Sequence, residues 1–221
     1  MRRPPRDEAE LLARARSLAG CTVDDLSRAL GFRLDGAPVA TKGKIGELLE
    51  RALGATGGSA ATWDFPELKV ELKTIPLDAR GVPRESTFVC AVSLLDAERA
   101  EWETSWVRAK LARVLWVPIA VGPDGPRRIG DALLWSPSPE QEGILKGDFD
   151  DILGRIGAVG VEGMSARIGR WLQLRPKAAH GRVRTPAPGG DAGLIDTVPR
   201  GFYLRSRLTG AILADVEAVP P

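Results

Sequence analysis

The chain contains very few of the residues on which several common chemistries depend. Its 221 residues include one histidine and two cysteines. The histidine, His180, stands in a polar stretch without a neighbouring ligand motif, which argues against zinc proteases, nucleases with two imidazoles and most Ser-His-Asp hydrolases. Cys21 and Cys90 have no paired spacing, so the sequence indicates neither a disulfide framework nor a zinc site.

Long apolar runs and nucleotide-binding loops are also missing. No run approaches the roughly 20 apolar residues that span a membrane, and the arginine-rich start lacks the apolar core of a signal peptide, so we expect cytoplasmic residence. No Gly-x-x-x-x-Gly-Lys-Ser/Thr loop is present, which argues against nucleotide hydrolysis. The 31 basic and 29 acidic residues leave a net charge of only +2, and 43% hydrophobic content with six tryptophans is typical of a globular core.

The most informative segment runs from Asp64 to Lys73. After Pro66, which cannot donate to a sheet ladder and marks a turn, apolar and charged residues alternate from Leu68 onward. This period of two predicts a strand on which Glu71 and Lys73 project to the same side. Asp64 would approach them from the neighbouring turn.

Two carboxylates and a lysine in this pattern suit phosphodiester hydrolysis with a hard divalent cation. Asp64 and Glu71 would hold the cation, which stabilises the charge that builds on the phosphoryl oxygens. Lys73 would orient the attacking water, lower its pKa, or stabilise the developing oxygens, and the sequence leaves these roles open. Taken alone, a Glu-x-Lys tripeptide is more often an ordinary solvated charge pair on a strand.

Neighbouring segments add charged residues in suitable places. Residues 44–53 predict a helix ended by Gly54, and at about 100° per residue Glu50 falls beside Leu53 at the edge of the apolar stripe. Its carboxylate can therefore point into a cleft. Farther on, residues 102–111 lead into the apolar run 114–120, which predicts a passage from helix to strand with Lys110 near the hinge.

Eight short blocks in one order resemble the MutH family of nicking endonucleases over nearly the whole chain. The blocks are Lys42–Glu50, Val70–Pro76, Thr87–Cys90, Trp102–Ser105, Lys110–Trp116, Leu133–Pro137, Leu174–Ala179 and Pro199–Leu204.

The resemblance implies a restriction-endonuclease-like fold and active site. Carried over position by position, it makes Asp64 and Glu71 the metal-binding acids and Lys73 the catalytic lysine, with supporting catalytic roles for Glu50 and Lys110. It implies Mg²⁺ as the cofactor, with Mn²⁺ as a substitute, and leaves open whether one or two ions bind.

The resemblance also implies which residues contact DNA. It points to Arg175, Lys177 and Tyr203, together with Lys42 and Phe88, as contacts to a GATC site and its adenine. An arginine can bond guanine O6 and N7 with both arms, worth roughly 1–3 kcal/mol of discrimination, and a tyrosine against adenine N6 could reject a methyl group by clash. Ordinary phosphate contact is the alternative for Arg175 and Lys177.

Charge distribution favours a DNA-facing segment near the end of the chain. Residues 165–210 contain nine basic and two acidic residues, nine minus two or +7. Such a patch suits phosphate contact and predicts salt-dependent binding, although an arginine-rich surface can also be merely solvated.

The activity expected from the resemblance is a magnesium-dependent nick in the unmethylated strand of hemimethylated GATC sites during mismatch repair. The family's partners are MutL, and MutS through MutL, and we expect a monomer that is associated with the nucleoid. Two alternatives remain: a GATC restriction endonuclease cutting both strands, and a non-catalytic methylation-sensing DNA-binding protein. The Asp64, Glu71 and Lys73 set argues against the second, since binding alone needs no metal-holding carboxylates.

For the fold we expect an α/β protein with a restriction-endonuclease-like mixed sheet flanked by helices. It would form a single domain over 1–221, with a catalytic lobe at about 1–120 and a DNA-reading lobe at about 121–221 around a DNA cleft. The expected helices cover 7–19, 22–30, 44–53, 138–156 and 207–217. The expected strands cover 68–75, 86–94, 113–120, 131–135, 170–175 and 201–205, with 68–75 and 86–94 as an antiparallel pair and 178–198 as a loose stretch.

Overall fold

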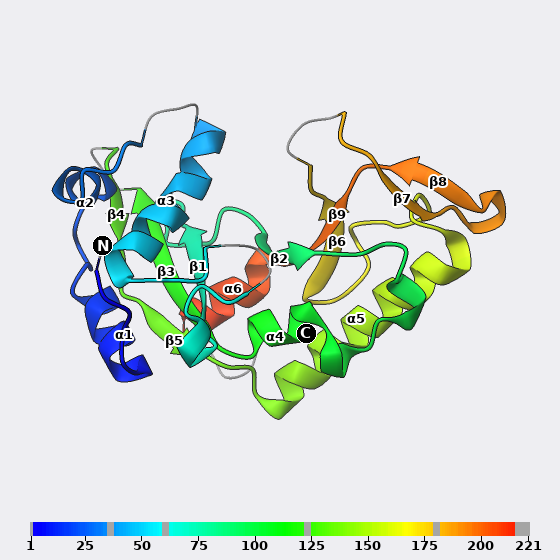
Figure 1. Ribbon diagram of the computed structural model, residues 1–221, viewed down its shortest axis with the longest axis horizontal. Helices are drawn as coiled ribbons and strands as arrows, with labels where there is room; N and C mark the ends of the chain where they lie inside the picture. Colours follow the sequence, from blue (N-terminus) through cyan, green and yellow to red (C-terminus); the bar gives the residue numbers. More distant parts are fainter. Residues whose placement is uncertain (1, 35–37, 59–61, 122–124, 179–181, 215–221) are drawn as a thin grey trace. The chain divides into compact units, whose positions relative to one another are not determined.

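A computed structural model describes residues 2–34, 38–58, 62–121, 125–178 and 182–214 (Figure 1). Two compact units divide the chain. The first comprises residues 1–85, 113–136 and 209–221, and the second comprises 86–112 and 137–208. Both units thus draw on several segments of the sequence, where the sequence analysis placed one lobe boundary near residue 120.

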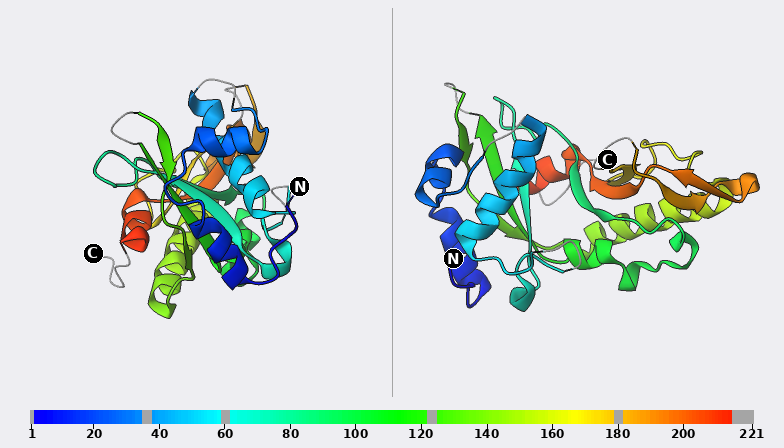
Figure 2. Two further views of the ribbon diagram at one scale, coloured as in Figure 1. Left: turned by 90° about the vertical axis from the view of Figure 1, so that its left-hand side faces the viewer. Right: turned by 45° about the horizontal axis from the view of Figure 1, so that its top comes forward.

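The first unit is a mixed sheet covered by helices. Strand β1 (Glu71–Pro76) pairs in parallel with β3 (Val114–Val121), which also pairs antiparallel with β4 (Arg127–Ile129) and β5 (Leu133–Trp135). Helices α1 (Glu8–Arg16), α2 (Val23–Ala29) and α3 (Pro38–Leu53) belong to the same unit, and α3 contacts β1. Figures 1 and 2 show α3 crossing one face of the strands. Strand β3 is central because its continuous apolar run is buried on both faces.

The carboxyl end of α3 is fixed by a buried arginine. The Arg14 guanidinium donates to the carbonyl oxygens of Leu53 (2.9 Å) and Arg3 (2.7 Å) and to Glu10 Oε1 (2.6 Å). Gly54 then reverses the chain at φ +86°, where a Cβ atom would lie 2.4 Å from the Arg3 carbonyl oxygen. The last turn of α3, with Glu50 on it, is therefore held firmly against α1.

The second unit is a three-stranded antiparallel sheet with a long helix. Strand β9 (Arg200–Leu204) lies between β2 (Thr87–Ala91) and β6 (Leu172–Pro176). Helix α5 (Pro139–Val159) begins with a capping box formed by Ser138 and Gln141 and contacts β6. The unit also contains α4 (Trp106–Leu111) and a hairpin of β7 (Thr185–Pro188) and β8 (Leu194–Thr197), while α6 (Ser206–Leu213) runs across the boundary at residues 208–209.

The predicted α/β class and the mixed sheet flanked by helices are confirmed. The predicted antiparallel pair of strands 68–75 and 86–94 is wrong, because β1 pairs with β3 and β2 pairs with β9. Leu68 ends a short 3₁₀ turn and Lys69 is left-handed (φ 54°), so the alternation begins before the strand does. The DNA cleft expected between lobes stays a prediction.

The region expected to be loose, 178–198, contains the β7–β8 hairpin instead. Its strands were missed because β7 includes Pro186 and Pro188, which cannot donate to a ladder, and only a strand with an open edge tolerates them. No helix in the described ranges is long and apolar enough to cross a bilayer.

Packing of α5 against β9 depends on Phe149. This side chain is 2% exposed, stacks on Phe202 (centroids 5.5 Å apart) and meets Trp102 edge to face (5.5 Å). Phe149→Ala should lower the free energy of unfolding by about 3–5 kcal/mol, since it leaves a cavity and removes both aromatic contacts. Urea unfolding measures this. Val159→Ala, at an exposed position of the same helix, should change stability by less than about 0.5 kcal/mol.

Candidate active site

Asp64 is brought to β1 by a tight fold of the chain. Phe65 and Val70 exchange backbone hydrogen bonds of 3.0 and 3.2 Å, which closes the turn around Pro66. Asp64 Oδ2 then accepts the backbone N–H of Leu72 at 2.7 Å. The predicted turn therefore places the first carboxylate beside the strand, at the residue between Glu71 and Lys73.

A second segment docks on the Asp64 backbone. The N–H groups of Thr56 and Gly57 both donate to the Asp64 carbonyl oxygen at 3.1 Å. Only glycine fits at position 57, because a Cβ atom there would lie 1.9 Å from the Trp63 carbonyl oxygen. This contact draws the chain that leaves α3 toward Asp64, and with it the end of the helix that contains Glu50.

Glu71 and Lys73 form a largely buried ion pair. Lys73 Nζ lies 2.7 Å from Glu71 Oε1, and the two side chains are 14% and 3% exposed. The prediction that they project together from the strand is confirmed. The Glu71 backbone is fixed as well, since its N–H donates to the Arg113 carbonyl oxygen at 3.0 Å. A buried carboxylate is costly without a partner, and Lys73 supplies the compensating charge.

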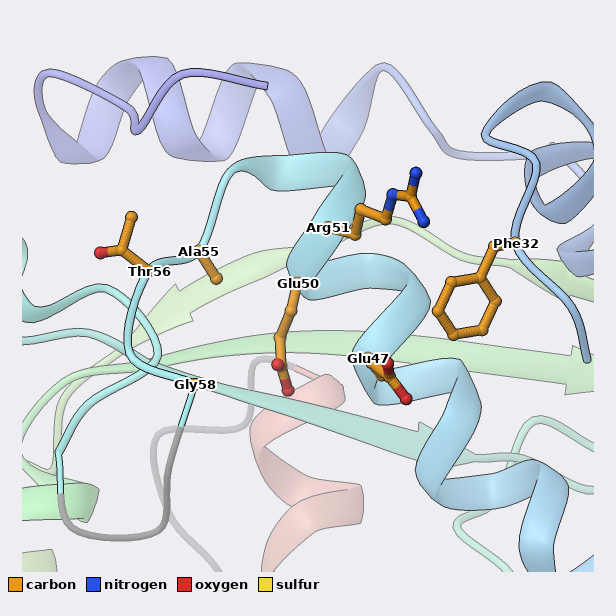
Figure 3. A pocket seen from close by; sticks show the side chains of 7 residues that line it. All are labelled: Phe32, Glu47, Glu50, Arg51, Ala55, Thr56 and Gly58. Atoms are coloured by element: carbon orange, nitrogen blue, oxygen red, sulfur yellow. The ribbon is translucent and has the colours of Figure 1, made fainter. Parts of the chain in front are cut away.

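Glu50 lies close enough to these groups for their charges to change its pKa. The pKa of Glu50 is raised to about 7, mainly by burial and also by the negative charges of Asp64, Glu71 and Glu47, with Lys73 opposing the rise. Figure 3 shows the carboxylates of Glu47 and Glu50 projecting from one side of α3. They line a pocket of about 360 Å³ that is completed by Phe32, Arg51, Ala55, Thr56 and Gly58.

This residue set fits a hard divalent cation in its chemistry. Carboxylate oxygens are the ligands that Mg²⁺ prefers, and a bound cation would offset the negative charge of Asp64 and Glu71 that, after burial, raises the pKa of Glu50. Within the described ranges no three acidic, histidine or cysteine side chains form a ready metal cage. Glu71 Oε1 accepts a hydrogen bond from Lys73, and Asp64 Oδ2 accepts one from the Leu72 N–H. The carboxylate oxygens that would bind the cation are thus held in place by protein groups.

Glu47 is the residue of this site that the sequence analysis missed. It adds to the negative field at Glu50 and lines the same pocket. The available signal was its position three residues before Glu50 on a predicted helix, a spacing that puts two side chains on one face.

Other predicted residues lie elsewhere. Lys110 is on α4 in the second unit, 5% exposed, with Nζ 5.8 Å from the centre of the Trp106 ring, and its catalytic role stays a prediction. Lys42 is in α3, but its side chain is outside the described residues. His180 is also outside them.

Four of the residues predicted to contact DNA gather in the second unit as an aromatic–cation cluster. Phe88 on β2 and Tyr203 on β9 meet edge to face (5.3 Å). The Arg175 guanidinium lies 5.6 Å from the Tyr203 ring centre, and Lys177 Nζ lies 4.8 Å from that of Phe88. Gly201 makes room for this, because a Cβ atom there would lie 2.7 Å from Phe88 Cε2. Arg175 and Lys177 are exposed, so their charges face solvent.

Because the pKa of Glu50 is raised, replacing this residue should change how the free energy of unfolding depends on pH. The folded-state pKa of about 7 exceeds the ordinary glutamate value of 4.5, so wild-type stability falls as pH rises from about 4.5 through 7. Glu50→Gln stays neutral and avoids this loss. The gain over wild type should appear in that window and reach on the order of 1–3 kcal/mol at pH 8, reduced by partial solvent exposure. Urea unfolding in EDTA at pH 5 and pH 8 measures it.

Glu67→Gln, at an exposed position of the same unit, is the control. An equal difference between Glu50→Gln and wild type at both pH values would contradict the assignment.

The chain is similar to known proteins along nearly its whole length. A family model described as "DNA mismatch repair enzyme MutH" matches residues 53–148. The DNA mismatch repair protein MutH of Serratia proteamaculans is 46% identical over 214 residues, covering 96% of this chain and 94% of the relative. Those of Yersinia enterocolitica (45%, covering 96% and 94%) and Pectobacterium atrosepticum (47%, covering 95% and 92%) are similar to the same extent. With identity of this level along nearly its whole length, the chain belongs to the MutH family of DNA mismatch repair enzymes, whose restriction-endonuclease-like fold it shares.

Proposed function

We propose that this protein is a magnesium-dependent endonuclease that nicks the unmethylated strand at hemimethylated GATC sites during mismatch repair. The nick leaves 5′-phosphate and 3′-hydroxyl ends. The observation that supports this most directly is the gathering of Glu50, Asp64, Glu71 and Lys73 in the first unit, linked by the Glu71–Lys73 ion pair and the charge effects on Glu50. Membership of the MutH family supports the endonuclease class.

Asp64 and Glu71 would hold Mg²⁺, with Mn²⁺ as a substitute. When bound, the ion withdraws negative charge from the phosphoryl oxygens as the attacking water, phosphorus and leaving 3′-oxygen come into line. The protein fixes both carboxylates beforehand through the Leu72 N–H on Asp64 and the backbone bond of Glu71 to Arg113. Little rearrangement is then needed when the phosphate arrives.

Lys73 is the side chain suited to act on the water and on the phosphate. Its ammonium is oriented by Glu71 Oε1 at 2.7 Å and is only 14% exposed, so its charge is weakly screened. It would orient the water and stabilise charge developing on the phosphoryl oxygens. Glu50 supports the site by adding negative charge toward the cation, and Lys110 is proposed as a second supporting lysine.

The aromatic–cation cluster would read the DNA. Arg175 is exposed and can present both arms of its guanidinium to a guanine, while Tyr203, directly beneath it, would pack against adenine N6 and reject a methyl group. Lys177 and Phe88 complete this surface, and Lys42 is proposed as a further contact. We propose action as a monomer in the cytoplasm on nucleoid DNA, switched on by MutL after MutS finds a mismatch.

Removing either half of the Glu71–Lys73 pair should abolish cleavage while sparing DNA affinity. Glu71→Ala and Lys73→Ala should each lower the nicking rate by at least about 100-fold, since each removes a group that acts on the reacting phosphate. Duplex affinity, measured by fluorescence anisotropy in Ca²⁺, should change by less than about three-fold, because the residues proposed to bind the DNA are others, such as Arg175 and Lys177. Glu67→Ala, exposed in the same unit, is the matched control.

The assay uses a supercoiled plasmid with one hemimethylated GATC site, Mg²⁺ and MutL. Open circles support nicking, linear product indicates cutting of both strands, and bound but intact DNA indicates a non-catalytic binder. Loss of affinity equal to the loss of cleavage in Glu71→Ala and Lys73→Ala would contradict their catalytic assignment.

Arg175→Ala should weaken sequence reading. The ratio of binding constants for a GATC duplex over a scrambled duplex should fall by about ten-fold or more, as expected from a base contact worth roughly 1–3 kcal/mol. Arg184→Ala, another exposed arginine of the same unit, should weaken both duplexes alike. An unchanged ratio in Arg175→Ala would show that Arg175 contacts phosphate only.

A further inference from the structure

A buried carboxylate of the second unit holds the start of a strand. Asp148, on α5, is 8% exposed. Its Oδ1 accepts the backbone N–H of Arg170 at 2.6 Å, and its Oδ2 accepts those of Trp171 (2.6 Å) and Leu172 (2.8 Å). A charge buried in this way is tolerated only because hydrogen bonds satisfy it, so these three donors and the carboxylate depend on each other.

An arginine also binds the loop that leads into β6. The Arg205 guanidinium donates to the carbonyl oxygens of Ala166 (2.8 Å), Ile168 (3.1 Å) and Gly169 (3.1 Å). Gly169 is left-handed (φ +82°), and a Cβ atom there would lie 2.1 Å from the Leu172 carbonyl oxygen. In residues 166–172, which lead into β6, Asp148 thus binds backbone N–H groups and Arg205 binds backbone carbonyl groups.

Asp148 and Arg205 fix the chain where it enters β6, in addition to the ladder with β9 and the buried side chains of the strand. Strand β6 has five residues and, among the described strands, pairs with β9 at the edge of the sheet. Side chains alternate between the faces, so a slip of one residue would move Arg175 to the opposite face. In the observed register Gln173 lies opposite Tyr203 and Arg175 opposite Gly201, which puts Arg175 over the Tyr203 ring.

The helix that supplies Asp148 is itself fixed to β9. The next residue, Phe149, stacks on Phe202, the neighbour of Tyr203. Asp148 therefore connects the start of β6, through α5, to β9, the strand that contains Tyr203. The two sides of the aromatic–cation cluster are linked through α5 as well as through the strand ladder.

We propose that Asp148 is a positioning residue for DNA reading: it sets the register of β6 and so holds Arg175 over Tyr203. The proposal rests on the proposed function for the role of Arg175 and Tyr203 in recognising the site. The placement of Arg175 itself is testable without any DNA.

The test exploits the single tyrosine of the chain. Full-length protein labelled with 3-fluorotyrosine gives one ¹⁹F resonance, from Tyr203, which responds to the nearby guanidinium. Asp148→Asn keeps the size of the side chain but presents an N–H donor where an acceptor is required. It should shift or split this resonance toward the position seen in Arg175→Ala, and lower the preference for GATC over scrambled duplex by about ten-fold, as expected when a two-armed arginine contact is weakened.

Asp151→Asn is the matched control on the same helix, where the carboxylate is exposed and pairs with Arg155. It should leave the resonance and the preference unchanged. If Asp148→Asn fails to fold by circular dichroism, Arg205→Lys replaces it. The donors of a lysine sit on a single nitrogen and cannot reproduce the bonds that Arg205 makes from both Nε and Nη2, so the same shift is expected.

A wild-type resonance and wild-type preference in folded Asp148→Asn would overturn the proposal. An equal loss of binding to both duplexes with an unshifted resonance would also overturn it, since that is the mark of a merely structural residue. If wild-type protein itself shows no preference for GATC, the proposed function fails, and the resonance alone decides whether Asp148 places Arg175.

Discussion

The burial of several carboxylates close to one another is the constraint on which the first unit is built. Asp64, Glu71 and Glu50 lie close enough to disturb one another, as the raised pKa of Glu50 shows. Such an arrangement opposes folding, and it persists because Lys73 neutralises part of the charge and the backbone N–H of Leu72 donates to the Asp64 carboxylate. The bridge between Phe65 and Val70 and the close approach of Gly57 to Trp63 are the local structures that hold these groups together.

The same device recurs in the second unit for a different purpose. Asp64 accepts a backbone N–H from β1 and thereby fixes the strand that bears Glu71 and Lys73. Asp148 accepts three N–H groups at the start of β6, the strand that bears Arg175. In both cases a side chain from outside a short strand determines where the strand begins. Fixing the start of a short strand matters, because its register decides the face on which each functional side chain lies.

The two units contain different clusters of charged residues. The first gathers acids around the Glu71–Lys73 pair, and the second displays Arg175 and Lys177 over aromatic rings. Positive charge over a ring face is stabilised by the ring quadrupole while it stays available to solvent. The proposed function assigns the chemistry of the phosphate to the first cluster and the recognition of the bases to the second.

Local pattern in the sequence determined the elements whose signal is short-range. The helix 44–53 and the placement of Glu71 with Lys73 on one side of a strand follow from periodicity alone, and the turn at Pro66 follows from the chemistry of proline. Tertiary structure decided what these patterns could not. It pairs β1 with β3 and not with β2, forms strands from the proline-containing segment 185–188, and brings Glu47 into the acidic group. Strand partners and charge environments depend on residues distant in sequence, and their energies arise only when burial brings those residues together.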